Sequence, residues 1–406
     1  MLDYKLFADD NLVHLKPFTP RRTDGFVIWD FVTVNDRQKN SHETKLFTTA
    51  SVIEIGNFLN TVDKRLNLPN KVILKFENLE VQDKLSITLL EIMVFNFIRD
   101  KGFDIRIEVD PNTIRPNISE RSFAISPLKI LNEFKDNTRE FLDAFNRSIR
   151  NVTHFRRIYP YNASPSVLST WGDEIHAFLD FKRKNAIPKK VIDQLQELLV
   201  ELIGNGIEHS KSDVLIDIDI TGSTFKLEDY DTLYYAISIS VVNLSYTLYH
   251  EAVKEKIALI DDDLLLSGRN ASRYKYIKQA FQAHAQYFYE QKYTEQDFWT
   301  MAGLQKSISG RENNFQSGGR GSVQLIKVLQ SLASNNTSYL LSGKRILNFE
   351  NELLSSNEDD WIGFNTESNF LNKPDFKIFS EPNFNLPGTA YNFQFVYSDE
   401  EATHGN

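Results

Sequence analysis

The chain has 406 residues, which is enough for two or three domains. Charged residues make up 25% and hydrophobic residues 41%, which is the usual balance in globular domains. Acidic side chains outnumber basic ones by 55 to 46, and the resulting net charge of −9 argues against a general nucleic-acid binder, which needs a basic face. There is no cysteine, so disulfides, thiol catalysis and zinc–thiolate sites are excluded.

The N-terminal segment and the apolar runs indicate whether the chain is expected to carry a secretory signal or a membrane-spanning segment. The first thirty residues include Asp3, Lys5 and Asp9 and lack an apolar core segment, so no secretory signal is expected. The longest apolar-rich run, residues 87–98, is too short to cross a bilayer. We therefore expect a cytoplasmic protein with no membrane segment.

Residues 1–125 predict a small α/β unit. A strand is expected at 72–76, a helix at 86–99 and a second strand at 105–109, with another strand or hairpin arm at 25–34. Gly102 follows the helix, where a C-terminal cap is expected.

The order of strand, acidic turn, helix and strand in this unit resembles the sulfate-transporter/anti-sigma-antagonist (STAS) domain. In that family a serine on the turn before the helix can be phosphorylated, and Ser86 is the nearest candidate here. The alternative is a serine that caps the helix.

Residues 126–184 are predicted to form a helical connector. Ser126 and Pro127 have the pattern of a helix start, and apolar residues then recur at helical spacing. A further helical segment is expected at 171–181. Between them lies a basic cluster, expected to be a solvated helix end, with a phosphate or partner contact as the alternative: Arg147, Arg150, Arg156 and Arg157.

The helix that begins after Pro188 carries the main functional pattern. Its apolar residues recur three and four apart, and on the opposite face Glu201, Asn205 and His209 fall four apart and stack. Gly204 and Gly206 flank Asn205, and because each glycine costs roughly 1 kcal/mol against alanine in a helix, a close approach to this backbone is expected. Such a face suits a hydrated metal ion that holds phosphates; the alternative is a solvated helix face.

The remaining elements follow in a recognisable order. Alternation predicts strands at 214–220 and 234–242, and residues 247–310 are mostly helical in pattern. A glycine-rich turn at 317–322 opens a helix at 323–332. Strands are then expected at 338–349 and 391–397.

This order resembles the GHKL ATPases, the superfamily of gyrase, heat-shock chaperone ATPases, histidine kinases and mismatch-repair ATPases, over residues 185–398. The resemblance implies ATP and Mg²⁺ as cofactors. It implies that Asn205 ligates magnesium, that Glu201 is the general base orienting water, and that His209 neighbours the phosphates. Magnesium takes few protein ligands and keeps its waters and substrate phosphates, which suits such a helix face.

Two further segments match family motifs. The turn matches the second glycine box, whose backbone N–H groups converge on phosphates, with a charged contact expected from its arginine; the alternative is a plain loop. Its residues are Gly318, Gly319, Arg320 and Gly321. Thr389, after Gly388, matches the threonine whose hydroxyl helps to hold adenine.

One departure affects the base pocket. Where the family has Asp-x-Gly-x-Gly, with the aspartate accepting from the adenine amino group, this chain has Asn243, Ser245 and Thr247. Asn243 can still accept, but a neutral acceptor contributes roughly half what a charged one does, and its amide could also turn and donate. Ser245 and Thr247 are expected to narrow the approach to the base. The choice between adenine and guanine stays open, as does a plain turn role for Asn243.

No histidine lies in the context of a phosphoacceptor helix. His154 is the closest by location and is expected to be structural. A two-component sensor kinase is therefore disfavoured.

The sequence thus predicts an α+β chain: a STAS-like domain at 1–125, a helical connector at 126–184, a GHKL-type nucleotide-binding domain at 185–398 and a tail at 399–406. The nucleotide-binding domain is expected to be a Bergerat-type α/β sandwich, a mixed sheet with helices on one face.

The expected function is ATP binding and hydrolysis by a regulatory protein whose nucleotide-gated lid, residues 247–320, controls a protein partner. Glu201 favours hydrolysis, because a base is needed only if water attacks. The alternatives are an anti-sigma-type serine/threonine protein kinase, acting on a partner or on its own N-terminal unit, and a degenerate nucleotide-binding interaction module. Family members commonly dimerise, so a homodimer stays open; no nucleic-acid or membrane partner is expected.

Overall fold

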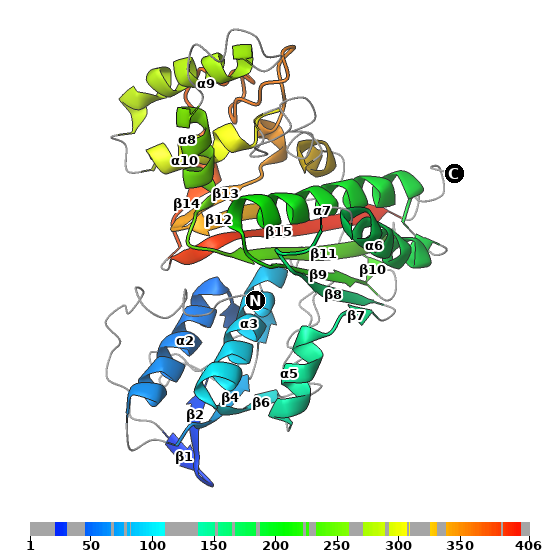
Figure 1. Ribbon diagram of the computed structural model, residues 1–406, viewed down its shortest axis with the longest axis vertical. Helices are drawn as coiled ribbons and strands as arrows, with labels where there is room; N and C mark the ends of the chain where they lie inside the picture. The colour runs from blue at the N-terminus through cyan, green and yellow to red at the C-terminus, as the bar shows by residue number, and fades with distance from the viewer. Residues whose placement is uncertain are drawn as a thin grey trace.

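The computed structural model shows an α+β fold, as predicted (Figure 1). None of the helices it describes has the length and apolarity needed to cross a bilayer. The residues described are 21–30, 45–65, 69–76, 79–81, 83–109, 137–150, 153–164, 167–183, 187–221, 225–226, 233–259, 271–288, 292–306, 308, 325–330, 338–382 and 385–398.

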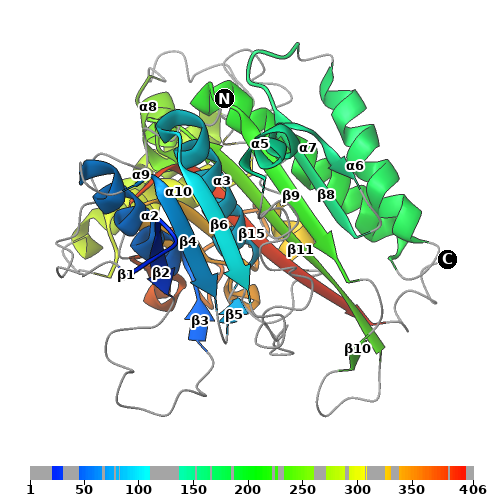
Figure 2. The same ribbon diagram turned by 90° about the horizontal axis from the view of Figure 1, so that it is seen from below.

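The N-terminal part contains a four-stranded sheet in the order β1-β2-β4-β6, in which β2, β4 and β6 run parallel (Figure 2). A second, two-stranded sheet pairs β3 with β5. The helix and the two strands predicted at 72–76 and 105–109 are confirmed, and Gly102 caps α3 in the left-handed region. The strand expected at 25–34 is confirmed at Phe26–Asp30, and residues 31–34 lie outside the described residues. The elements are β1 (Arg21–Thr23), β2 (Phe26–Asp30), β3 (Lys45–Phe47), α2 (Thr49–Lys64), β4 (Lys71–Phe76), β5 (Leu79–Val81), α3 (Lys84–Lys101) and β6 (Asp104–Val109).

The larger sheet has nine strands in the order β14-β13-β12-β15-β11-β9-β8-β7, with β10 paired to β11. A mixed sheet was expected, but every described pair in it is antiparallel, and the parallel pairs lie in the smaller sheets. Its strands are β7 (Ile149–Arg150), β8 (His154–Tyr159), β9 (Val214–Ile220), β10 (Phe225–Lys226), β11 (Leu233–Leu244), β12 (Tyr339–Gly343), β13 (Arg345–Asn348), β14 (Phe379–Ser380) and β15 (Leu386–Ser398).

Strand alternation gives this sheet two buried faces. Helices α6 (Leu168–Arg183) and α7 (Lys189–Ser210) cover one face, and α3 of the N-terminal part lies on the other (Figure 1). On β9, Ile216 and Ile218 pack in the core beneath α7, whereas Leu215 packs with the N-terminal part. Successive residues of one strand therefore serve the two faces.

The connector predicted at 126–184 is wrong as a purely helical segment. Its first described element, α5 (Thr138–Asn146), is a helix, but β8 pairs with β9 along its whole length, from His154 opposite Asp219 to Tyr159 opposite Val214. Arg156 is fully buried and ion-paired rather than part of a solvated helix end.

The N-terminal part and the large sheet share one core. Every residue of α3 from Lys84 to Ile98 is buried, and the same hydrophobic cluster contains Leu215, Val242 and Leu244 of the large sheet. The boundary drawn at residue 125 therefore does not separate two independent cores.

A helical block lies at one end of the large sheet, and the helical pattern expected at 247–310 is confirmed for the residues described there (Figure 1). Buried aromatic residues of this block pack with the segment that follows β13, and they belong to the same hydrophobic cluster as α7 and the sheet face beneath it: Tyr293, Phe298, Trp361 and Phe370. Its elements are α8 (Tyr249–Leu259), α9 (Ala271–His284), η4 (Ala285–Tyr287), α10 (Glu295–Gly303), η5 (Asn351–Leu353) and η6 (Phe376–Ile378).

Candidate functional site

A cavity opens between α7, α8 and the adjoining ends of β11 and β15. The space between these walls, with the open solvent at its mouth included, is about 1010 Å³. Four of the residues predicted from the sequence to hold or hydrolyse the nucleotide line it, although they come from distant parts of the chain: Glu201, Asn205, Asn243 and Thr389.

Helix α7 brings Glu201 and Asn205 to the cavity one turn apart, and both are half-buried. The side chain of His209 lies outside the described residues. The close approach expected at the flanking glycines is made by the protein itself: a Cβ on Gly206 would lie 2.5 Å from Cγ2 of Val214 on β9. Gly206 thus lets the C-terminal part of α7 lie directly against β9.

Asn243 lies at the end of β11 and is 5% exposed. Its Nδ2 donates to the Ser212 hydroxyl at 2.6 Å, to the Ser212 carbonyl at 3.3 Å and to the Asp213 carbonyl at 3.2 Å. Its Oδ1 is buried and has no hydrogen-bond partner among the described residues.

This network settles which way the carboxamide faces. Backbone carbonyls only accept, so the amide nitrogen must face Ser212 and Asp213, and the oxygen must take the remaining position. Buried polar atoms without a partner are uncommon, so the Oδ1 acceptor of this cavity-lining residue calls for an explanation. The donor orientation that the sequence left open is excluded by this geometry.

Thr389 is the direct cross-strand neighbour of Asn243. The two strands meet this closely because Gly388, at φ +115°, has no side chain; a Cβ there would lie 2.1 Å from the Asn243 carbonyl oxygen. The Thr389 hydroxyl lies 3.4 Å from the Ser342 hydroxyl, which itself donates to the Gly388 carbonyl at 2.9 Å. The Thr389 hydroxyl is thereby held beside the Asn243 carboxamide.

Ser245 and Thr247 differ in their relation to the cavity. The Ser245 hydroxyl donates to the Ser210 carbonyl at 3.2 Å and accepts from the Thr247 N–H at 3.1 Å. Ser245 therefore connects the end of β11 to the last turn of α7. Thr247 lines the cavity, whereas Ser245 does not. The narrowing expected at Ser245 is not seen.

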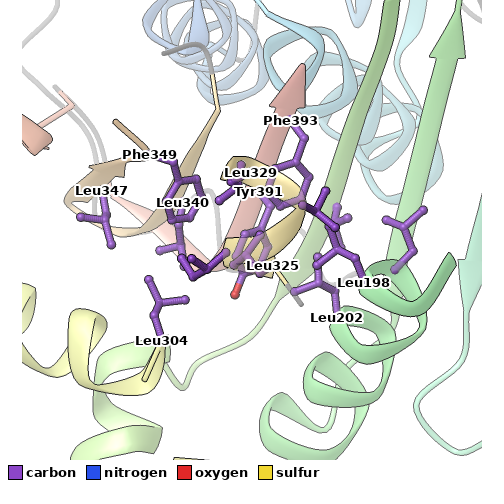
Figure 3. Close-up of a cluster of buried hydrophobic side chains, with 14 of the residues drawn as sticks. Leu198, Leu202, Leu304, Leu325, Leu329, Leu340, Leu347, Phe349, Tyr391 and Phe393 are labelled. Carbon is purple, nitrogen blue, oxygen red and sulfur yellow. The ribbon is translucent and has the colours of Figure 1, made fainter. Parts of the chain in front are cut away.

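Several lining residues were not predicted from the sequence. Tyr391 of β15 joins Leu202, Leu304 and Leu325 in an apolar wall (Figure 3). Tyr249 of α8 also lines the cavity, and burial raises the pKa of both tyrosine hydroxyls, so they remain neutral at physiological pH.

The glycine box lies outside the described residues, and this applies to Gly318, Gly319, Arg320 and Gly321 alike. The helix predicted after it is confirmed where it is described, at residues 325–330. Since Leu325 lines the cavity, the segment that follows the box reaches the site.

The side-chain oxygens of Glu201 and Asn205 are too few to bind a magnesium ion alone, and a ligand would have to supply further oxygen atoms. No cluster of three or more histidine or acidic side chains occurs among the residues the structure describes. A Mg²⁺ ion here would depend on the Asn205 amide oxygen, on water and on phosphates. The carboxamide and carboxylate are the right donor types for that arrangement.

Two other sequence candidates lie away from the cavity. Ser86 is fully buried on α3, its hydroxyl donates to Asp83 at 2.7 Å, and Asp83 rather than Ser86 caps the helix. Both interpretations of Ser86, an accessible phosphoacceptor and a capping residue, are therefore wrong for this fold. His154 is buried and bonded to Asp217 at 2.8 Å, so its structural role is as expected.

Comparisons with known proteins found no matching family model, and no match among curated proteins or solved structures. The chemistry of the cavity is the remaining guide to function.

Proposed function

We propose that this chain is a GHKL-type protein that binds ATP with Mg²⁺ in the cavity, hydrolyses it, and uses the nucleotide state to control a protein partner. The observation that carries the proposal is the buried, unpartnered Oδ1 of Asn243 beside Thr389, in a cavity whose α7 wall carries Glu201 and Asn205. A cytoplasmic location, where ATP is available, belongs to this proposal.

The acceptor favours adenine over guanine. The exocyclic amino group of adenine donates a hydrogen bond and would satisfy Oδ1, whereas guanine has a carbonyl oxygen at the same ring position. Two acceptors facing each other would leave both unsatisfied, at a cost of about 1–3 kcal/mol for the buried group. Because Asn243 is neutral, affinity is expected to be lower than with a charged acceptor.

The α7 wall suits the phosphate end. Asn205 would hold Mg²⁺ through its amide oxygen, and the ion would neutralise phosphate charge. Glu201, one helical turn earlier, is placed to orient and deprotonate a water molecule. Hydrolysis is therefore the favoured reaction of the site.

The base pocket is tested by calorimetric titration of the full chain with ATP, GTP and ITP in the presence of Mg²⁺. ITP differs from ATP at the base, where a carbonyl replaces the amino group. We expect ATP to bind about tenfold or more tightly than ITP or GTP. Equal affinities, or no binding of ATP, would overturn the proposal.

Turnover is tested with ATP labelled at the γ-phosphate. Glu201→Ala is expected to abolish release of free phosphate while sparing binding, and Asn205→Ala to lose Mg²⁺-dependent binding. Glu197→Ala is the matched control, because Glu197 is exposed one turn away on the same helix and does not line the cavity. Wild-type turnover in both site variants would contradict the assignment.

The same labelling experiment separates the alternatives. Labelled protein in place of free phosphate would indicate the anti-sigma-type kinase, and neither product would indicate a nucleotide-binding interaction module. Ser86 is not expected to be the residue that such a kinase labels, because it is buried on the sheet face opposite α7. The partner, which includes a second copy in a homodimer, is a protein rather than nucleic acid or membrane under this proposal.

A further inference from the structure

Helix α8 presents one face to the cavity. Four of its residues line the cavity at positions i, i+3, i+4 and i+7, which is the spacing of a single helix face: Tyr249, Ala252, Val253 and Lys256. Two residues of this face also pack on α10, where Gly303 allows close contact; a Cβ there would lie 2.6 Å from Val253 and 2.7 Å from the Tyr249 hydroxyl. The orientation of α8, and of its lysine, is thus determined by packing.

The two walls show which end of the cavity Lys256 occupies. At the base end, the Tyr249 N–H donates to the Ser342 hydroxyl at 3.1 Å, next to Thr389. Lys256 follows seven residues later, about 10 Å further along the helix axis. On α7, Gly206 packs against Asn243, so Glu201 likewise lies away from the base end, toward the helix N-terminus.

Two charged residues line the cavity. Among the described lining residues, Glu201 is the one acid and Lys256 is the one cation. A triphosphate brings several negative charges, and a cation in the cavity wall supplies compensation for them. Lys254, on the same helix, lies on a different face: it pairs with Glu295 of α10 at 2.7 Å and does not line the cavity.

We propose that the Lys256 ammonium binds the β- and γ-phosphates of the nucleotide, an inference that rests on the proposed ATP site. A lysine is a compact charge with three rotatable donors, which suits contact with phosphate oxygens. The residue then selects for the phosphate chain, while Asn243 and Thr389 select for the base.

The test is calorimetric titration of the full chain with Mg²⁺ and ATP, and separately with adenosine. Lys256→Met is expected to weaken ATP binding about ten- to a hundredfold, the range of a charge-assisted hydrogen bond, and to leave adenosine binding within about twofold. Lys254→Met is the matched control and should change neither. Lys256→Arg should retain most of the ATP affinity, because it keeps the charge.

The outcomes separate this inference from the one it rests on. If Lys256→Met leaves ATP binding unchanged, or weakens adenosine and ATP equally, the phosphate contact is overturned and the ATP site stands. If the wild-type chain binds neither ligand, both are overturned. The unfolding midpoint of Lys256→Met, compared with that of Lys254→Met, shows whether a loss comes from misfolding.

Discussion

Substitution of Lys84 by methionine tests how the N-terminal part is held to the large sheet. Lys84 lies on α3 and is 3% exposed, and its Nζ lies 2.8 Å from Asp217 and 2.5 Å from Asp219 of β9. Asp217 also contacts His154 at 2.8 Å and Arg156 at 3.3 Å. One ammonium therefore serves two buried carboxylates at the shared core.

The expected loss is large for a single side chain. Methionine preserves the length and the apolar stem but removes the charge from two carboxylates that stay buried. Breaking one partner out of a buried pair costs about 3–5 kcal/mol, and no discount for solvent screening applies because all three groups are buried. Lys101→Met is the matched control: Lys101, also on α3, pairs with Asp63 at 2.8 Å but is 42% exposed, so about 0–1 kcal/mol is expected.

The dependence on pH gives a second, independent readout. Burial alone would raise the pKa of Asp217, but Lys84, His154 and Arg156 hold it below its usual value. A depressed folded-state pKa contributes stability above the unfolded-state value of about 3.9, and this is lost as pH falls below it. Burial would lower the pKa of Lys84, but the two aspartates raise it, so Lys84 keeps its charge throughout the acid range.

The assay is urea unfolding of wild type, Lys84→Met and Lys101→Met at pH 7 and at pH values stepped down through 4. Lys84→Met removes an interaction that depends on ionised carboxylates, so the gap to wild type should be full at pH 7 and narrow as the pH falls through 4. A gap under about 1 kcal/mol at pH 7, or one that widens in acid, would refute the reasoning.

Removal of residues 1–136 would expose the apolar residues Leu215, Val242 and Leu244, so the truncated chain should aggregate in size-exclusion chromatography; a monodisperse product would contradict the shared core. Gly388→Ala should lower the unfolding free energy by more than about 2 kcal/mol, because the added Cβ meets the Asn243 backbone at 2.1 Å as well as an unfavourable φ of +115°. Gly25→Ala is its control, with φ +83° and no atom within 4 Å, and should cost about 1 kcal/mol; equal losses in the two variants would show that the contact is relieved elsewhere.

Local periodicity predicted most elements of the fold because their apolar residues repeat without interruption. The helix after Pro188 and the strands at 214–220 and 234–242 are of this kind. Strand β8 was missed because two consecutive arginines, Arg156 and Arg157, hide its alternation. The burial of Arg156 is compensated by Glu91 and Asp217, which are more than sixty positions away, so no local pattern could reveal it.

Some residues of the candidate site could likewise be predicted from the sequence, and others could not because they depend on tertiary packing. Glu201 and Asn205 were found by helical spacing, and Asn243 and Thr389 by the order of motifs; the structure places all four on one cavity. Lys256 and Tyr249 were missed because their exposure to the cavity depends on how α8 packs on α10, a tertiary contact made through Gly303. A helix with charged residues on several faces gives no hint of which face meets a ligand.

The departure at Asn243 is explained by its neighbours. Two backbone carbonyls, those of Ser212 and Asp213, lie 3.2–3.3 Å from Nδ2 and require a donor. The other side of the same group holds an acceptor, Oδ1, without a partner among the described residues. An ionised aspartate could supply the acceptor but would turn its other oxygen toward the two carbonyls, which repels rather than binds. A carboxamide of this length supplies both groups, so the neutral residue preserves the proposed adenine contact while it joins β11 to the start of β9.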